Sequence, residues 1–143
     1  MKYSMESSDD GYEERAPTEK ISADRIRAMY DLNARLSLSY EGLEHWFTAS
    51  SRVFVVGRNM DCDLVVATPV ASRHHARFIY RKGKFVMIDQ STNGTYVQIA
   101  GNDQICLLNG EEFPLVNEGV ISLGRPVEKG DPHLIHFRNP GYY

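Results

Sequence analysis

The sequence lacks the features that mark membrane-spanning and secreted proteins. Its 143 residues contain no apolar run close to the roughly 20 residues that a bilayer-spanning helix needs. The N-terminus is acidic and polar, without the apolar segment of a secretory signal. Cysteine is scarce, because Cys62 and Cys106 are the only two and they form no CxxC pair. We therefore expect reduced thiols and a cytoplasmic location, with no membrane partner.

Metal-type spacing is absent as well. His74 and His75 are adjacent, and adjacent side chains on a strand point to opposite faces, so this pair cannot chelate one ion. His133 and His136 have no cysteine or acidic partner at the spacing of a zinc finger. We expect no metal site and no cofactor.

Catalytic signatures and an overall positive charge are also missing. The sequence has no P-loop, no pairing of a nucleophile with a base and no paired carboxylates in a cleft-forming context, so we expect no enzymatic activity. The net charge is −3. This balance argues against a nucleic-acid partner, because phosphate contacts along a nucleic acid need a basic excess.

The charge that is present is unevenly distributed. Residues 1–24 carry seven acids and three bases, whereas residues 52–84 carry seven bases and two acids. The polar, acidic composition predicts a disordered tail over residues 1–20. The basic segment is either a solvated surface or a site for an anionic group.

A short helix and then many strands are predicted after this tail. Residues 21–33 read as a short helix or linker, with Ser22 as the N-cap and Ile21 and Ile26 at the hydrophobic-staple positions. Beyond it, apolar residues recur with period two between Gly, Asn and Asp turns, which predicts an all-β antiparallel sandwich, followed by a C-terminal tail over residues 139–143. The expected strands cover residues 35–42, 43–47, 52–57, 62–66, the hairpin 75–89, 95–99, 104–108, 111–115, 119–124 and 134–137.

Three loops of this sandwich carry polar groups where strands stop. The first is Gly57-Arg58-Asn59, where glycine lets the backbone bend and Arg58 offers a planar fork of donors that matches phosphate oxygens. The second is Ser72-Arg73-His74-His75-Ala76, with a hydroxyl and a second cation. Taken singly, an exposed arginine is most often a solubilising charge, and His75 alone is better interpreted as a histidine packed at the sheet edge.

The third loop runs from Asp89 to Tyr96 and contains the pair Asn93-Gly94. Asn-Gly between two strands is typical of a tight hairpin turn, since both residues tolerate a positive φ. The surrounding row of hydroxyls and amides is richer than a turn requires. The third loop is therefore also a candidate for ligand contact.

The order of these motifs resembles the forkhead-associated (FHA) domain family. Gly-Arg is followed by Ser-Arg-x-His-Ala, then Asp-x-Ser-Thr-Asn-Gly-Thr-Tyr-Val, then Gly-x-Ile-x-Leu-Gly at 119–124. The similarity covers residues 35–138 and places the domain at 34–138. It implies an eleven-stranded β-sandwich of the SMAD/FHA type that binds phosphothreonine peptides in signal transduction. A looser similarity to modules at the C-terminal end of bacterial class III nucleotide cyclases implies a regulatory role in a cyclase or kinase pathway.

The resemblance assigns five residues to the phosphopeptide. It implies that the Arg58 guanidinium binds the phosphate, that the Ser72 hydroxyl donates to a phosphate oxygen, and that Arg73 adds a contact through its side chain or its backbone. It further implies that Thr92 contacts the phosphate from the opposite loop and that Asn93 bonds the peptide backbone.

Other positions have supporting roles in this interpretation. Gly57, His75 and Gly94 hold loop shape, and Val70 selects an apolar residue at the third position after the phosphothreonine. Thr18 lies three residues before an isoleucine in the acidic tail, so phosphorylated Thr18 is a candidate ligand for the domain itself or for a neighbouring copy. The alternatives are a merely solubilising tail and, for the whole chain, a phosphate-independent FHA scaffold or oligomerisation module.

Overall fold

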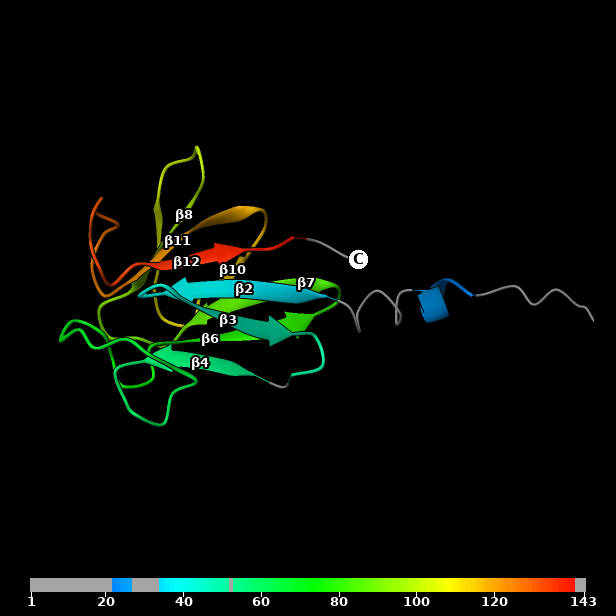
Figure 1. The fold of residues 1–143 in the computed structure, drawn as a ribbon, viewed down its shortest axis with the longest axis horizontal. Helices are drawn as coiled ribbons and strands as arrows, with labels where there is room; N and C mark the ends of the chain where they lie inside the picture. Colours follow the sequence, from blue (N-terminus) through cyan, green and yellow to red (C-terminus); the bar gives the residue numbers. More distant parts are fainter. Residues whose placement is uncertain (1–21, 27–33, 52, 141–143) are drawn as a thin grey trace, which may run out of the picture.

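The computed structural model describes residues 22–26, 34–51 and 53–140, and these form a β-sandwich of two facing sheets (Figure 1). The described residues contain eleven strands, which confirms the all-β fold class. Each observed strand agrees with its expected range to within two residues at either end. The strands are β2 Arg35–Tyr40, β3 Leu43–Thr48, β4 Phe54–Gly57, β5 Leu64–Val65, β6 Ala76–Arg81, β7 Lys84–Asp89, β8 Thr95–Ile99, β9 Ile105–Leu107, β10 Glu112–Pro114, β11 Glu118–Leu123 and β12 Ile135–Arg138.

The strands are divided five to six between the sheets. One sheet has the order β10-β7-β6-β4-β5 and the other β3-β2-β12-β11-β8-β9. Every strand pair is antiparallel except β4 with β5, which is parallel. The exception arises because residues 58–63 loop back to the middle of β4, where the Asp63 amide donates to the Val55 carbonyl at 2.9 Å. The chain then runs along β4 a second time in the same direction.

Two-residue turns close the hairpins at the positions that the sequence indicated. Glu41 and Gly42 join β2 to β3 with φ values of 51° and 78°, and Lys82 and Gly83 join β6 to β7 with 52° and 80°. Two consecutive positive φ angles match the right-handed twist of the flanking strands. The turns therefore fix the register of both hairpins.

The core lies between the sheets and is joined by aromatic rings. The alternating apolar residues of β2, Leu36, Leu38 and Tyr40, are all buried. Phe47 of β3 packs across the gap against Phe85 of β7, with ring centroids 5.6 Å apart in an edge-on arrangement. Phe47 is therefore the side chain that ties the outer strand of one sheet to the other sheet.

The N-terminal helix is described only in part. Residues 23–26 are helical, and the Arg25 amide donates to Ser22 Oγ at 3.1 Å, as expected for an N-cap. Ile21, residues 27–33 and the acidic tail with Thr18 lie outside the described residues. No helix within the described ranges is long and apolar enough to cross a bilayer.

Truncation of Phe47 tests its role in joining the two sheets. Phe47→Ala removes a side chain that is 1% exposed, and we expect it to lower the free energy of unfolding by about 3–5 kcal/mol. Leu43→Ala on the same strand is the matched control, since Leu43 is 67% exposed and its loss should change stability by no more than about 0.5 kcal/mol. Urea unfolding of both variants measures the difference, and equal midpoints would contradict this role for Phe47.

Candidate functional site

Three loops meet at one end of the sandwich, the left-hand end in Figure 1. They are residues 58–63 after β4, 66–75 before β6 and 90–94 between β7 and β8. The first two are joined by backbone hydrogen bonds, from the Arg58 amide to the Ser72 carbonyl at 2.9 Å and from the Asn59 amide to the Arg73 carbonyl at 3.1 Å. The first two polar motifs of the sequence are thus brought into contact.

Gly57 is required by a close approach of two backbones. A Cβ at this position would lie 2.2 Å from the Arg73 carbonyl oxygen and 2.8 Å from the His75 amide nitrogen. Gly57 is not among the glycines with a positive φ. The sequence predicted glycine here for a bend, but the structure shows that its lack of a side chain is what matters, because it lets the 72–75 segment lie against the end of β4.

Arg58 directly follows β4, and its exposed guanidinium is oriented by one hydrogen bond. Its Nε donates to the Ala71 carbonyl at 3.0 Å. Its terminal amino groups make no hydrogen bond or ion pair with any residue of the described ranges. The guanidinium is therefore oriented by the neighbouring loop while four of its N–H groups remain available to an anion.

His75 is the buried connection between the second and third loops. The Ser72 amide donates to its Nδ1 at 2.9 Å, so the other ring nitrogen, Nε2, carries the proton and donates to the Gly94 carbonyl at 2.8 Å. The side chain is 0% exposed, and burial lowers the pKa of the imidazole below its ordinary 6.5, against the opposing effects of the Gly94 bond and of Asp89. Geometry and burial both keep the ring neutral.

The third loop is tied to the second by two bonds from its predicted ligand-binding residues. The Thr92 amide donates to Ser72 Oγ at 3.0 Å, and Asn93 Nδ2 donates to the Val70 carbonyl at 3.1 Å. The Ser72 hydroxyl proton has no acceptor among the described residues. The Ser72 Oγ thus accepts one hydrogen bond from the third loop, and its O–H group remains able to donate to a ligand.

Asn93 and Gly94 do not form the hairpin turn that their sequence suggested. Only Gly94 has a positive φ, at 93°, and the strands on either side belong to different sheets, β7 to the five-stranded and β8 to the six-stranded one. The segment crosses between the sheets. A side chain at Gly94 would also place its Cβ 2.8 Å from Cys106 Sγ, so glycine is required here on two grounds.

Sequence reasoning assigned no role to Asp89, although its carboxylate shapes this crossover. Asp89 is 0% exposed. Its Oδ1 accepts from the Ser91 amide at 3.2 Å, from Ser91 Oγ at 2.6 Å and from Thr95 Oγ1 at 2.7 Å. The sequence signal was present in the hydroxyl-rich run after an aspartate, which is typical of a turn built on a side-chain acceptor.

Gly124 is a second residue that the sequence analysis left without a role. It ends β11 with φ 85°, and its amide donates to the Gly94 carbonyl at 2.9 Å. A Cβ there would lie 2.1 Å from the Val70 carbonyl oxygen. Gly124 therefore lets the end of β11 close the gap between the second and third loops.

Arg73 differs from the other predicted ligand residues. Its side chain is exposed and makes no hydrogen bond or ion pair with a described residue, whereas its carbonyl accepts from the Asn59 amide and from Cys62 Sγ, both at 3.1 Å. The structure therefore brings together Arg58, Ser72, Thr92 and Asn93, and the backbone of Arg73 has a structural role.

Three side chains that carry metal-ligand atoms, Asp61, Cys62 and His74, belong to the first and second loops.

Two comparisons of sequence place the chain among known proteins. Residues 54–124 match the family model described as FHA domain. The chain is 35% identical over 71 residues to the glycogen accumulation regulator GarA of Mycolicibacterium smegmatis, an overlap of 49% of this chain and 45% of GarA. It is 43% identical over 63 residues to the ABC transporter ATP-binding/permease protein Rv1747 of Mycobacterium tuberculosis, an overlap of 43% of this chain and 7% of that protein. The chain spans less than half the length of these curated relatives.

Solved structures share the fold. The FHA-1 crystal structure from Mycobacterium tuberculosis Rv1747 superposes with a TM-score of 0.59 at 28% identity, over 75% of this chain and 97% of that one. The MEK1 FHA domain in complex with a phosphothreonine peptide of HOP1 gives a TM-score of 0.56 at 22% identity, over 73% of this chain and 96% of that one. At 22% identity, the similarity to the MEK1 domain shows a shared fold and nothing more.

The buried imidazole predicts a pH response. Because the pKa of folded His75 lies below 6.5, the unfolded chain takes up this proton first as the pH falls, so acidification below about 6.5 lowers the free energy of unfolding until the folded pKa is reached. Nitrogen-15 NMR of the imidazole should show the neutral form, with the proton on Nε2, at pH 6.5, where an unperturbed imidazole is about half protonated. A His75 that is half protonated at pH 6.5 or above, or that carries its proton on Nδ1, would contradict this assignment.

Proposed function

This chain belongs to the FHA domain family, and on that premise we propose that it is a signalling module that recruits partner proteins carrying phosphothreonine. The observation that carries the proposal is the pairing of Arg58 with Ser72. Among the described residues, the terminal N–H groups of the Arg58 guanidinium and the Ser72 hydroxyl proton have no partner, and the two residues lie on loops joined by a 2.9 Å backbone bond. A phosphate monoester carries a charge of about −1.5 to −2 at neutral pH and has three acceptor oxygens, which match this set of donors.

The energetics of such a site suit reversible signalling. Hydrogen bonds to a charged group contribute roughly 1.5–3 kcal/mol each. A few of them, less the cost of ordering a flexible peptide, leave a dissociation constant on the order of micromolar. In this proposal Arg58 and Ser72 bind the phosphate, Thr92 and Arg73 add contacts at its edge, and Asn93 binds the peptide backbone.

Val70 is proposed to select the peptide residue three positions after the phosphothreonine. It is a half-buried residue of the second loop, and its carbonyl accepts a hydrogen bond from the Asn93 side chain of the third loop. An apolar side chain at this place favours an apolar partner. A phosphopeptide series with aliphatic or acidic residues at that position measures the preference, and a strong acidic preference would remove Val70 from this role.

The proposal is limited to binding. We propose a binding module and not an enzyme, and a cytoplasmic location that rests on the two free cysteines, Cys62 and Cys106. The relatives named above are a glycogen regulator and a transporter, so a link to nucleotide cyclases has no support among them and is not part of the proposal. A phosphate-independent scaffold or oligomerisation module is the alternative function.

Substitution of Arg58 tests the proposed phosphate contact. We expect Arg58→Ala to weaken binding of a phosphothreonine peptide by about 10- to 150-fold, which corresponds to the loss of one charged contact of about 1.5–3 kcal/mol. Arg58→Lys should fall between wild type and Arg58→Ala, because lysine keeps the charge and loses the planar fork. Isothermal titration calorimetry with phosphorylated and unphosphorylated forms of one peptide measures all three.

Arg81→Ala is the matched control for these variants. Arg81 is an exposed arginine at the far end of β6, paired with Glu112, and its loss should leave peptide affinity unchanged. Equal affinity of Arg58→Ala and wild type would contradict the proposed site. Equal affinity for the unphosphorylated peptide would favour the phosphate-independent alternative.

We further propose that phosphorylated Thr18 occupies the site from the same chain or from a neighbouring copy. The support is local sequence: Thr18 lies in an acidic segment with Ile21 three residues later, which is the apolar position that Val70 is proposed to favour. A tethered peptide reaches an effective concentration on the order of millimolar. With a micromolar intrinsic affinity, the tail would weaken binding of an outside peptide by about a thousandfold.

Phosphorylation of Thr18 by a kinase or by semisynthesis tests this self-binding. The backbone resonances of Arg58 and Asn93 should shift on phosphorylation, and the shift should vanish in Arg58→Ala. Independence of the shift from protein concentration identifies binding within one chain, and dependence on it identifies binding between chains. Unmoved Arg58 and Asn93 resonances would end the proposal.

A further inference from the structure

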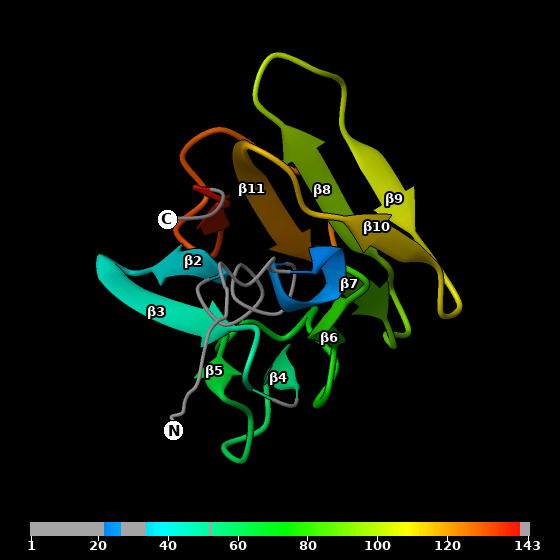
Figure 2. The ribbon, with the colours of Figure 1, turned by 90° about the vertical axis from the view of Figure 1, so that its right-hand side faces the viewer.

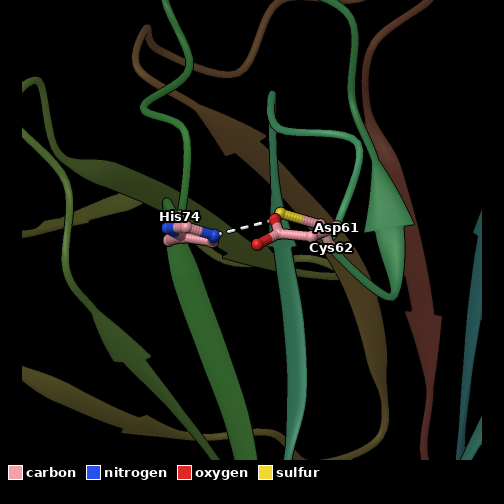
Figure 3. A group of neighbouring side chains, drawn as sticks. All are labelled: Asp61, Cys62 and His74. Atoms are coloured by element: carbon pink, nitrogen blue, oxygen red, sulfur yellow. Dashed lines mark hydrogen bonds and ion pairs between the residues drawn. The ribbon is translucent and has the colours of Figure 1, made fainter.

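Three different metal-ligand side chains converge where the first and second loops of the candidate site, residues 58–63 and 66–75, lie against each other. Asp61 and Cys62 come from the 58–63 loop, and His74 comes from the segment before β6 (Figure 3). Their ligand atoms, a carboxylate oxygen, the cysteine Sγ and an imidazole nitrogen, all lie within 4.8 Å of one another. His74 Nε2 and Asp61 Oδ1 already form a 2.8 Å contact. His74 follows Cys62 by 12 positions, so two separate segments supply one compact group of ligand atoms.

This set of donors selects for zinc among the common divalent ions. Magnesium and calcium prefer oxygen ligands alone, whereas sulfur, imidazole nitrogen and carboxylate oxygen together suit Zn²⁺. Ligand atoms in a tetrahedral zinc site lie roughly 3.3–3.6 Å apart, given zinc–ligand distances of about 2.0–2.3 Å. Asp61 and His74 are exposed and Cys62 is buried, so small movements of the two exposed side chains bring them toward a fixed sulfur.

The oxygen and nitrogen ligands are oriented by their neighbours. Asn59 Nδ2 donates to Asp61 Oδ1 at 2.6 Å. Asn59 thereby has the position of an outer partner that orients a metal ligand, a feature that metal sites usually possess.

The sulfur ligand is compatible with the surrounding hydrogen bonds. Cys62 Sγ donates to the Arg73 carbonyl at 3.1 Å, and a metal ion takes the place of that thiol proton. The Arg73 carbonyl keeps a second donor, the Asn59 amide at 3.1 Å. Formation of a thiolate on the metal therefore leaves no buried carbonyl without a partner, which would otherwise carry a penalty.

We propose that Asp61, Cys62 and His74 form a three-ligand zinc site with an open fourth position, and that the bound ion links the loops that carry Arg58 and Ser72. The expectation of no metal site rested on His74 and His75 pointing apart, and they do, since His75 is turned inward to Ser72 and Gly94. The partners of His74 come instead from the preceding loop.

Cobalt(II) substitution tests the site directly, because a thiolate bound to cobalt gives an ultraviolet charge-transfer band. The full-length chain should develop this band with one equivalent of Co²⁺ and lose it when Zn²⁺ is added. Cys62→Ala should abolish the band. His74→Gln should weaken metal binding by more than about 100-fold, since even outer-shell partners contribute about 10- to 100-fold.

Matched variants outside the cluster keep this test specific. Cys106→Ala and His136→Gln remove the other free thiol and an exposed histidine of β12, and both should retain the band at wild-type affinity. Circular dichroism confirms that each variant is folded. A wild-type chain without the band, or a band that survives Cys62→Ala and disappears in Cys106→Ala, would show that Asp61 and His74 form only a surface ion pair beside a buried thiol.

The proposed link between the loops has a separate readout that rests on the proposed function. Zinc should tighten phosphothreonine-peptide binding by at least about fivefold in wild type and leave Cys62→Ala unaffected, because coupling between two sites is reciprocal and typically 5- to 150-fold. Peptide affinity that ignores zinc would overturn the link between the loops. Absence of peptide binding with and without zinc would overturn the proposed function, while the cobalt band would still decide the metal site.

Discussion

The buried imidazole of His75 is the interaction on which the loop end of the sandwich depends. One ring nitrogen accepts from Ser72 and the other donates to Gly94, so a single side chain joins loops that lead into different sheets. Removing it would leave the Ser72 amide without its partner, at a penalty of about 1–3 kcal/mol, and the Gly94 carbonyl would keep only its bond from the Gly124 amide. The Ser72 hydroxyl and the third loop hold their relative positions because this ring is neutral and fixed in one tautomer.

Three glycines make that connection geometrically possible. A side chain at Gly57, Gly94 or Gly124 would place its Cβ within 2.2, 2.8 or 2.1 Å of a neighbouring atom, and for the first and third that atom is a backbone oxygen. Such distances are shorter than any van der Waals contact, so larger residues would push the loops apart. Close backbone approach explains the glycine at the end of β4, and close approach together with a positive φ explains the glycine that follows β11.

The sequence allowed the strands and hairpins to be predicted because these depend on local pattern. Period-two alternation between Gly, Asn and Asp turns located the elements to within two residues. The motif order also identified the loops that meet. The prediction failed where the outcome depends on which sheet a strand joins, because Asn93-Gly94 crosses between sheets instead of closing a hairpin. Local spacing does not say which sheet a strand joins, although the hydroxyl-rich run after Asp89 did signal a turn built on a side-chain acceptor.

The groups that orient the loops and the groups left for a ligand belong to the same side chains. Arg58 uses Nε to bond Ala71 and keeps its terminal amino groups, and Ser72 accepts from Thr92 and keeps its proton. Each donor is thus held in position before a ligand arrives, which reduces the ordering cost of binding. A chain with net charge −3 has no general attraction for anions. In the proposed function, selectivity for phosphate therefore has to come from the direction of a few fixed donors, and the buried bonds of His75 hold the loops that carry them.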